Sequence, residues 1–509
     1  MDKRSIFGFM GILTMAVTMS NCSDSEENTT PEESGYKWST DGGQTSCDHL
    51  LFDEDGKENA NGTVIGNGNQ ELVFTGKQTL KKGTYTLKGW VYIGDGAELT
   101  LEPGTVIKGD KETKAALIVE RGGKLYAQGT ASSPIVFTSA AEAGSRRPGD
   151  WGGVIICGKA RNNQTEMQIE GGPRTKHGGN DDADNSGVLS YVRIEFAGYP
   201  FKPDQEINGL TLGSVGSATK IDHVQVSFSN DDSYEWFGGT VNCKYLIAYK
   251  GWDDDFDTDN GFSGKVQFGL AVRDSKIADQ SQSNGFESDN CADGAQISPY
   301  TTATFSNITF VGPKTDASFV NSKDYITAGD YYPGNGSALG KFQAGMQIRR
   351  SSRLSCVNSV VTDWPIGLII DGEKGNTVEQ AKAGNLTLKN IFIANADIIG
   401  SDANKCYEDK EYDFSTKAVK EDSEQSYSHT YFAQEASNRS FSDKSALMLT
   451  DNKGVGVPCM PQAGSNVFGA QSFTGLDSWF SNVTYIGAFD SNDTWLDGWT
   501  NFDPQSTKY

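Results

Sequence analysis

Residues 229–264 read SNDDSYEWFGGTVNCKYLIAYKGWDDDFDTDNGFSG, an apolar run held between two groups of aspartates. The centre of this stretch has the length and composition of one β-strand, and the glycine and aspartates that follow it are typical strand breakers. Similar strand-like segments begin 21 residues before Tyr245, at Val224, and 21 residues after it, at Val266. Strands that recur with such a period are typical of a β-solenoid, whose turns bury their apolar sides by stacking on one another.

The same kind of segment recurs along most of the chain. Further segments begin at Ala97, Gly123, Trp151, Val192, Asn307, Asn358, Asn390 and Asn482. Glycine is abundant, at 59 residues, and no amphipathic helical pattern recurs, which indicates many strands and tight turns. The pattern predicts an all-β fold, a parallel β-helix with loop insertions. A β-sandwich with irregular loops is the alternative, but it accounts less well for the regular spacing.

Two stretches interrupt the predicted coil. Residues 314–346 are rich in tyrosine and glycine, and residues 403–465 form a charged, polar excursion. Long loops on a rigid scaffold often carry binding sites, although both stretches are equally compatible with covering the side of the coil or capping its end. We predict one β-helix domain over residues 46–509 with these two insertions. Trp495 and Trp499 are expected to cap its last turn.

The N-terminus predicts the compartment. Lys3 and Arg4 precede a mostly apolar segment that is too short to span a membrane and is typical of a signal peptide. Cys22 follows closely, which favours cleavage after residue 21 and attachment of a lipid to its thiol over ordinary cleavage beside an incidental cysteine. We therefore expect residues 1–21 to be a signal peptide and residues 22–45 to be a flexible lipidated tether.

The charge of the chain excludes some partners. The whole chain has a formal charge of −23, and without residues 1–21 it keeps 42 Lys and Arg against 66 Asp and Glu, a charge of −24. Such a surface repels nucleic acids and anionic lipids. Neutral sugars, peptides, cations and other proteins remain as expected contacts, and contact with a membrane is expected through the lipid anchor alone.

Seven cysteines follow the predicted lipidation site, an odd number, so at least one has no partner within the chain. Cys157, Cys243 and Cys356 lie in apolar strand-like runs, where a small buried thiol is expected. Cys406 and Cys459 lie in polar, loop-like sequence and are the candidates for a disulfide if the fold brings them together. No spacing of cysteines and histidines is typical of a zinc site.

Several phrases of the sequence resemble a known family. LTLEPGTVIKG, GDWGGVIICGKA, YEWFGGTVNCKYLIAYKGWDDDFD and the ending VTYIGAFDSNDTWLDGWTNFDP are similar to phrases of the right-handed parallel β-helix lipoproteins of the Bacteroidota, a branch of the pectate-lyase-like solenoids. The likeness covers roughly residues 65–509 and implies a right-handed coil.

The same resemblance bears on location and partners. The acidic run SDSEE after Cys22 resembles the surface-export signal of these lipoproteins, which implies a lipid-anchored outer-membrane protein that faces the cell exterior. Several of them accompany outer-membrane importers of the starch-utilisation type. The resemblance therefore implies an importer complex as a candidate partner, with a glycan or another nutrient as the ligand.

The two aspartate groups of the opening stretch predict a cation site. Asp232 and Asp254 lie 22 residues apart, so they are expected at nearly the same corner on adjacent turns. Two carboxylates about 5 Å apart repel by roughly 3 kcal/mol at an effective dielectric of 20, so such a ladder must face solvent, meet basic side chains or hold a cation. Calcium suits oxygen-rich clusters, whereas solvated aspartate-rich turns are the alternative. The candidate ligands are Asp232, Asp254, Asp255, Asp257 and Asp259.

The signatures of an enzyme are incomplete. Hydrolases of polygalacturonate carry paired aspartates with Gly-His-Gly and Arg-x-Lys signatures, but the only comparable histidine is His177 in KHGG, and RIK does not occur. A calcium-assisted lyase needs a basic residue, for which Arg273, Arg349, Arg350 and Arg353 are the candidates, although arginines in strands more often pair with acids. Binding is therefore favoured over catalysis, and a calcium-assisted polysaccharide lyase or a glycoside hydrolase stays an open alternative.

Aromatic residues beside the aspartates indicate a sugar site, because such sites commonly join an aromatic face to carboxylates that accept hydroxyl hydrogen bonds. The candidate ligand-binding residues are Trp236, Tyr249, Trp252 and Arg273, and the alternative is that the rings fill corners of the coil. The sequence thus predicts a surface-exposed lipoprotein whose β-helix is a rigid ligand-binding or assembly module for glycan or nutrient capture beside an outer-membrane importer. An adhesin or a structural surface component is a further alternative.

Overall fold

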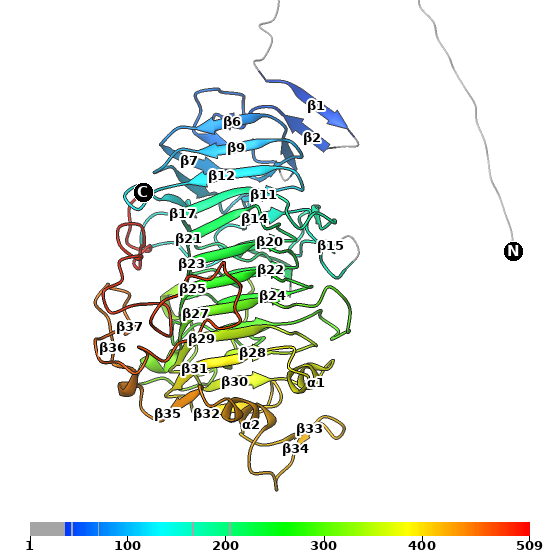
Figure 1. The fold of residues 1–509 in the computed structure, drawn as a ribbon. Helices are drawn as coiled ribbons and strands as arrows, with labels where there is room; N and C mark the ends of the chain where they lie inside the picture. Colours follow the sequence, from blue (N-terminus) through cyan, green and yellow to red (C-terminus); the bar gives the residue numbers. More distant parts are fainter. Residues whose placement is uncertain (1–35, 42–43, 70, 165–166, 203–204) are drawn as a thin grey trace, which may run out of the picture. The chain divides into compact units, whose positions relative to one another are not determined.

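The computed structural model describes residues 36–509 except 42–43, 70, 165–166 and 203–204. These residues wind into a coil whose strands form two long sheets, one of 13 and one of 16 strands (Figure 1). From β5 to β32, every strand of the 13-stranded sheet pairs in parallel with the strand one turn further along the chain. The fold is a right-handed parallel β-helix, so the predicted architecture is confirmed.

The two long sheets are called sheet A and sheet B. Sheet A consists of β1 (Trp38–Asp41), β2 (Gln44–Cys47), β5 (Leu72–Phe74), β8 (Trp90–Ile93), β11 (Ala116–Val119), β14 (Gly153–Cys157), β20 (Leu210–Gly213), β22 (Tyr234–Phe237), β24 (Phe256–Asp259), β26 (Phe286–Ser288), β28 (Ala344–Ile348), β30 (Ile366–Ile370) and β32 (Ile398–Ser401). Sheet B consists of β3 (Leu51–Phe52), β4 (Val64–Ile65), β6 (Lys77–Leu80), β7 (Thr84–Leu87), β9 (Glu98–Leu101), β10 (Val106–Gly109), β12 (Lys124–Gln128), β13 (Ile135–Ser139), β17 (Gly187–Glu195), β21 (Lys220–Ser227), β23 (Asn242–Tyr249), β25 (Lys265–Val272), β27 (Thr304–Val311), β29 (Ser355–Thr362), β31 (Leu388–Ala394) and β35 (Arg439–Phe441).

The remaining elements are short. Among the described residues, four hairpins lie outside the long sheets: β15 (Met167–Gln168) with β16 (Lys176–His177), β18 (Pro200–Lys202) with β19 (Gln205–Glu206), β33 (Tyr412–Asp413) with β34 (Ala418–Val419), and β36 (Leu449–Thr450) with β37 (Met460–Pro461). The helices are α1 (Thr377–Lys382), α2 (Tyr427–Gln434) and the 3-10 turns η1 (Pro313–Thr315), η2 (Gly329–Tyr331) and η3 (Lys444–Leu447). None of the helices in the described part of the chain has the length and apolar character that a membrane-spanning segment needs.

In β22 and β24 of sheet A, apolar side chains face into the coil and acidic side chains face outward. Tyr234 and Trp236 of β22 and Phe256 of β24 are fully buried in the largest apolar cluster, inside the coil. Glu235 lies between Tyr234 and Trp236, and Asp257 follows Phe256. Because successive side chains of a strand point to opposite faces, both acids lie on the outer face. The apolar interior therefore fixes which acidic residues face outward.

Sheet B bends in the middle of its long strands, where one residue of each strand has a left-handed backbone. These residues have φ between 50° and 64°, and they form what we call the bend column: Tyr191, His223, Tyr245, Phe268, Asn307, Asn358 and Asn390. Asparagine tolerates this conformation well. The four aromatic residues stack on one another, with neighbouring ring centroids 4.3, 4.4 and 5.0 Å apart, which offsets the backbone strain.

The strand pairing of sheet B shows a repeat that is longer than the sequence indicates. Val224 pairs with Leu246, and Leu246 pairs with Gly269, so the spacing along this part of sheet B is 22 and then 23 residues. The predicted alignment placed Val224 beside Tyr245, one position too early. Tyr245 is itself a bend residue with a φ of 58°, and an extended-strand pattern does not identify such a residue.

The chain after β35 runs back along the bend column toward the N-terminal turns (Figure 1). Trp499 lies against His223 and Trp495 lies against Tyr245, with ring centroids 5.7 and 5.5 Å apart. The prediction that these tryptophans cap the last turn is therefore wrong, since they pack against turns in the first half of the chain. Asn307 holds the same segment by donating two hydrogen bonds, of 3.0 and 3.2 Å, to backbone carbonyls of residues 485 and 487.

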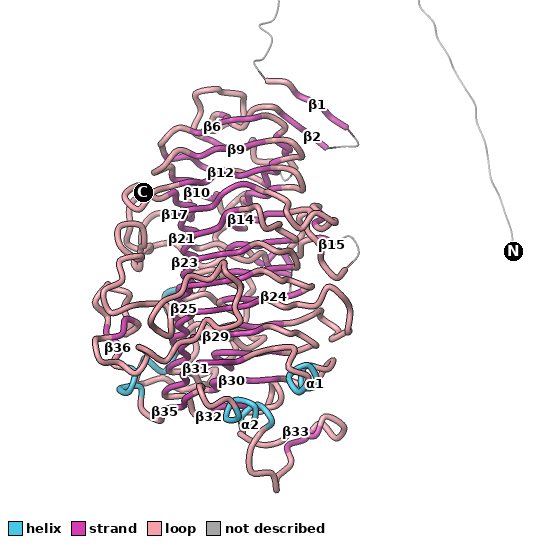
Figure 2. The backbone as a smooth tube through the Cα atoms, in the orientation of Figure 1, coloured by secondary structure: helices cyan, strands magenta, loops and turns pink. Residues whose placement is uncertain are grey.

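The predicted insertion at residues 403–465 lies only partly outside the coil. β35 pairs in parallel with β31, and α2 packs against β30 and β32. Figure 2 shows α1 and α2 together at this end of the coil. Residues 314–346 contain η1 and η2 and no strand before β28, in keeping with a loop insertion.

The cysteines correct one prediction and confirm another. Cys406 and Cys459 are free thiols, so the predicted disulfide is wrong. The Cys406 thiol donates to the backbone carbonyl of Glu408 at 3.3 Å, whereas Cys459 lies in the apolar cluster beneath the C-terminal segment. Cys157, Cys243 and Cys356 are fully buried thiols, as predicted. The predicted signal peptide and Cys22 lie outside the described residues.

Candidate functional site

The outer face of sheet A carries a column of acidic residues. Glu235 of β22 pairs in register with Asp257 of β24, Asp257 pairs with Glu287 of β26, and Glu287 pairs with Gln347 of β28. These residues hold the same position on consecutive turns, so their side chains share one face at a strand spacing of about 4.8 Å. We use the name acidic face for Asp231, Asp232, Glu235, Asp253, Asp254, Asp257 and Glu287.

The corner before these strands adds the aspartates that the sequence singled out. The backbone N–H of Asp254 donates to Asp232 Oδ1 at 2.8 Å, and the backbone N–H of Asn284 donates to Asp254 Oδ1 on the next turn. The prediction that Asp232 and Asp254 occupy the same corner on adjacent turns is therefore confirmed. Asn208, one turn before Asp232, donates from its side-chain amide to the carboxylate of Glu235, which joins the corner to the column.

Three groups of carboxylates on the acidic face lie close enough to share an ion. In each group, one carboxylate oxygen from every member lies within 4.8 Å of the others. The groups are Asp231 with Asp232 and Asp253, Asp232 with Glu235 and Asp257, and Asp254 with Asp257 and Glu287. Asp232 belongs to the first two groups and Asp257 to the last two, so the groups form one continuous row.

Several buried polar atoms along this row have no hydrogen-bond partner among the described residues. Asp253 Oδ1 and Asp257 Oδ1, both within the groups, are two of them. Thr211, in register with Glu235, and Gln347, in register with Glu287, bracket the column, and their side-chain polar atoms are also unpartnered although the residues are 1% and 0% exposed. Buried polar groups are nearly always satisfied, so this row has the character of a site for a bound group.

Burial and mutual repulsion raise the pKa of the carboxyl groups in the row. Burial, together with the neighbouring charges of Asp231 and Asp257, raises the pKa of Asp232 well above its usual range. Burial raises the pKa of Asp254 to about 6, and the N–H of Asn284 limits this shift by hydrogen-bonding to the ionised form. The row therefore gains full negative charge near neutral pH only at a large electrostatic cost, which a bound cation would remove.

Arginines neutralise the edges of the acidic face but not its centre. Asp255 forms an ion pair with Arg273 at 3.0 Å, and both side chains are fully buried. Arg349 pairs with Glu287 and also with Asp289, at 2.8 Å to the latter. Among the described residues, no lysine or arginine forms an ion pair with Asp232 or Glu235 at the centre of the row.

The structure divides the five predicted calcium ligands. Asp232, Asp254 and Asp257 belong to the three groups, whereas Asp255 and Asp259 belong to none of them. Asp255 is committed to Arg273, and Asp259 lies two residues beyond Asp257 along β24. Burial and the charge of Asp289 raise the pKa of Asp259 to about 7, so its carboxyl group ionises less readily than that of an exposed aspartate. The prediction of five candidate ligands is therefore corrected to Asp232, Asp254 and Asp257.

The predicted ligand-binding residues are buried. Trp236 and Trp252 are 0% exposed, and Tyr249 is 3% exposed, with its hydroxyl donating to the backbone carbonyl of Val455 at 3.1 Å. Arg273 is 2% exposed and bonds to Asp255 and to two backbone carbonyls. None of these side chains offers a free face to a sugar, so the expectation of an aromatic platform here is corrected, and the rings fill the coil and its corners instead.

Four residues of the acidic face were missed by sequence reasoning: Asp231, Glu235, Asp253 and Glu287. A signal for two of them was present in the segments YEWF, FDTD and FES, each of which places an acidic residue directly after an aromatic one. The aromatic residue points into the coil and the acid points out, so the common position predicts a column. The other two lie at corners, where the strand period does not apply.

The fold and the row together define a class: a right-handed parallel β-helix with a carboxylate-lined outer face on one sheet. The sequence profile of the pectate-lyase-like β-helix domain matches residues 72–438, well over half of the chain. The chain belongs to the pectate-lyase-like β-helix family. No curated protein and no solved structure matched in the corresponding searches.

Proposed function

We propose that the protein is a binding module that holds divalent cations on the acidic face and, through them, a glycan. The observation that carries this proposal is the row of three overlapping carboxylate groups, whose oxygen atoms lie within 4.8 Å of one another in each group. Three ionised carboxylates so close together repel one another strongly, by about 3 kcal/mol for each pair at an effective dielectric of 20. Since the described lysines and arginines leave the centre of the row unpaired, a metal cation is the fitting counter-charge.

The donor set fits calcium. Every candidate ligand atom in the row is a carboxylate oxygen, and Ca²⁺ takes six to eight oxygen ligands in loose geometry. Asp232, Glu235 and Asp257 would hold one ion, with further positions at the two neighbouring groups that share Asp232 and Asp257. A bound Ca²⁺ would neutralise these carboxylates and offer its remaining coordination positions to hydroxyl or carboxylate oxygens of a sugar.

Binding is favoured over catalysis because the basic residues near the face are committed. Arg273 pairs with Asp255, Arg349 with Glu287 and Asp289, and Arg350 with Asp289 at 2.7 Å. Arg353 lies on the ring of Tyr300, 3.5 Å from its centroid. A lyase needs a basic side chain free to take a proton from the sugar, and an ion-paired arginine serves this purpose poorly.

The location is part of the same proposal. A lipid on Cys22 would tether the β-helix to the outer membrane, facing the cell exterior, where a rigid module beside an importer would capture glycan or other nutrients. Metabolic labelling with a clickable fatty acid tests the anchor: we expect label on the wild-type protein and none on Cys22→Ala. Label that is equal in both proteins would exclude this anchor.

Glycan binding with and without calcium tests the function. Immobilised plant and host polysaccharides are probed with purified wild-type protein in 2 mM Ca²⁺ or in EDTA, and with Asp232→Asn, while Asp330→Asn, an exposed residue of η2, is the matched control. We expect binding in calcium, loss of binding in EDTA and in Asp232→Asn, and no change in the control. Depolymerisation of any of these glycans would support the lyase or hydrolase alternative instead, and binding to host glycans alone would support an adhesin.

A further inference from the structure

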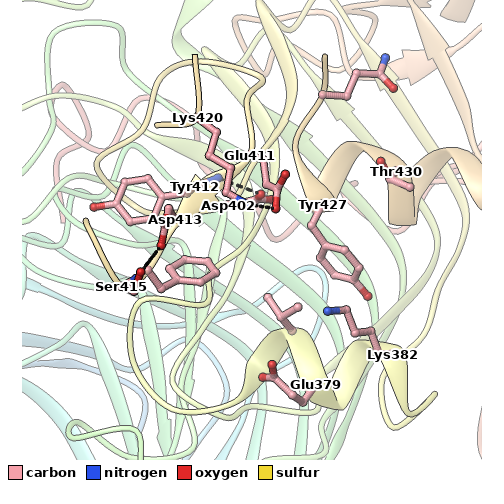
Figure 3. Close-up of a pocket in the computed structure, with 13 residues that line it drawn as sticks. Glu379, Lys382, Asp402, Glu411, Tyr412, Asp413, Ser415, Lys420, Tyr427 and Thr430 are labelled. Atoms are coloured by element: carbon pink, nitrogen blue, oxygen red, sulfur yellow. Dashed lines mark hydrogen bonds and ion pairs between the residues drawn. The ribbon is translucent and has the colours of Figure 1, made fainter. Parts of the chain in front are cut away.

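A separate hollow lies at the end of the coil, away from the acidic face. It has a volume of about 540 Å³ and opens between α1, α2 and the β33–β34 hairpin (Figure 3). This volume lies in the usual range of sites for small organic ligands. Its walls come mostly from the insertion at residues 403–465 and from α1, and none of its residues belongs to the three carboxylate groups.

Aromatic rings from different elements line this hollow. Phe414, at the tip of the hairpin, is 36% exposed, which is unusual for a phenylalanine in this structure. One part of its ring lies directly against the backbone of Gly372, since a Cβ atom there would approach the ring to 2.5 Å, and Tyr412 flanks it with ring centroids 5.4 Å apart. Tyr427, the first residue of α2, adds a third ring to the lining.

Paired charges stand on opposite sides of the same hollow. Figure 3 shows Glu379 and Lys382 of α1 on one side and Glu411 and Lys420 on the other. Glu411 and Lys420 form an exposed ion pair at 2.6 Å. Glu379 and Lys382 make no side-chain hydrogen bond or ion pair within the described part of the chain, and the Lys382 ammonium lies 5.2 Å from the ring centroid of Tyr427. Each side thus presents one donor and one acceptor beside an aromatic ring.

The two other acids of the hollow are already engaged. Asp402 accepts hydrogen bonds from the backbone N–H and the hydroxyl of Ser428, at 2.9 and 3.2 Å, and so holds the start of α2. Asp413 accepts from the backbone and the hydroxyl of Ser415, at 2.9 and 2.6 Å, within the hairpin. The charged side chains with the most hydrogen-bonding capacity left for a ligand are therefore those of Glu379, Lys382, Glu411 and Lys420. Hydrogen bonds from serine do not neutralise Asp402 and Asp413, so the lining holds four carboxyl groups against two ammonium groups.

We propose that this hollow binds one or two neutral sugar residues, independently of divalent cations. Sugar rings present apolar C–H faces that pack on aromatic rings, and vicinal hydroxyls both donate and accept, which matches a carboxylate and an ammonium side by side. A uronate would meet four carboxyl groups and only two ammonium groups, so the acidic lining favours a neutral sugar. The site lies on other elements than the acidic face, so it goes beyond the proposed function and its failure is independent of that proposal.

The test is saturation-transfer NMR and calorimetry in EDTA, which removes any contribution of cations at the acidic face. The probes are the methyl glycosides of glucose, galactose and N-acetylglucosamine, their β-1,4-linked disaccharides, and digalacturonate as the charged comparison. We expect at least one neutral disaccharide to bind, with saturation of its C–H protons, and to bind more tightly than digalacturonate. Absence of binding by every neutral probe, or tighter binding of digalacturonate, overturns the proposal.

Variants locate the binding. Phe414→Ala is expected to weaken binding of the disaccharide about three- to tenfold, the range for loss of one aromatic contact. Glu379→Gln changes an exposed residue whose side chain makes no hydrogen bond or ion pair among the described residues, so it should keep the fold, and it is also expected to weaken binding. Tyr332→Ala removes an aromatic residue that is 48% exposed outside the hollow and serves as the matched control. Unchanged affinity in both Phe414→Ala and Glu379→Gln contradicts the assignment of the site.

Discussion

The bend column of sheet B and the acidic face of sheet A are both ladders made by stacking equivalent residues on consecutive turns, but they differ in how they are satisfied. In the bend column, rings stack 4.3–5.0 Å apart, and Asn307 and Asn358 donate hydrogen bonds to the returning C-terminal segment. On the acidic face, the same geometry places like charges within 4.8 Å of one another. Repetition stabilises a neutral ladder by itself, whereas a charged ladder needs an external partner, and this difference points to a function.

The largest effect is expected where an acid of the opening stretch does have an internal partner. Asp255→Asn removes the charge that balances Arg273, and both side chains are 0% exposed. Breaking a buried ion pair from one side leaves a buried charge uncompensated, so the free energy of unfolding should fall by about 3–5 kcal/mol. Urea unfolding measures this change. The double variant Asp255→Asn with Arg273→Met should recover much of the loss, and no recovery would contradict the pairing.

A neutral ladder residue should also matter for stability. Asn307 is fully buried, has a φ of 58° and donates to two carbonyls of the C-terminal segment. Asn307→Ala loses these bonds and puts alanine in a strained left-handed conformation, so the free energy of unfolding should fall by about 2–3 kcal/mol. Asn307→Gly also loses the two hydrogen bonds, but glycine adopts the left-handed backbone without strain. This variant should therefore be less destabilised in the same urea experiment. Equal stability of Asn307→Ala and wild type would mean that the bend column does not hold the segment.

On the acidic face, neutralising one residue of the ladder should raise the stability of the metal-free protein, not lower it. Asp257 belongs to two carboxylate groups and has an unpartnered buried oxygen. In EDTA at pH 8, Asp257→Asn removes repulsion and should be about 1–2 kcal/mol more stable than wild type. Replacing EDTA with calcium should raise the stability of this variant less than that of the wild-type protein. Thermal unfolding in both buffers measures the two differences, with Asp330→Asn as the unaffected control, and destabilisation in EDTA would show that the ladder is satisfied without a cation.

The pH dependence of stability should separate the two ladders further. Burial raises the pKa of Asp254 to about 6 in the folded protein, and burial together with the charge of Asp289 raises the pKa of Asp259 to about 7, both above the ordinary value near 4. The folded state therefore holds these protons more tightly than the unfolded state. Stability in EDTA falls as the pH rises, from about 4 to 6 through Asp254 and from about 4 to 7 through Asp259, by about 1.4 kcal/mol per pH unit for each group. Calcium should flatten this slope. A slope that calcium leaves unchanged speaks against a site on the acidic face.

The sequence predicts the coil and the corner well, because both depend on local patterns. Strand-like segments at a regular spacing identify the solenoid, and the 22-residue separation of Asp232 and Asp254 places them on adjacent turns, as the 2.8 Å bond between them shows. Trp236 was misplaced for a local reason too, since alternation within YEWF sends Glu235 outward and the tryptophan inward.

Other features have no local signal. Trp495 and Trp499 pack against residues some 250 to 280 positions earlier in the chain, because the C-terminal segment returns along the coil, and no short pattern reports such a path. The bend residues have left-handed backbones that aromatic side chains adopt only because their neighbours on adjacent turns stack on them. The hollow at the end of the coil joins α1 to residues about 30 to 50 positions later and likewise follows from tertiary structure alone.

Calorimetric titration of the metal-free protein with Ca²⁺ tests the central claim most directly. For wild-type protein at pH 7, the carboxylate row predicts saturable binding with release of protons, seen as a heat that varies with the ionisation enthalpy of the buffer. The double variant Asp232→Asn with Asp257→Asn removes a member from every group and should abolish that binding. Absence of saturable Ca²⁺ binding by the wild-type protein, or undiminished binding by the double variant, would contradict the account.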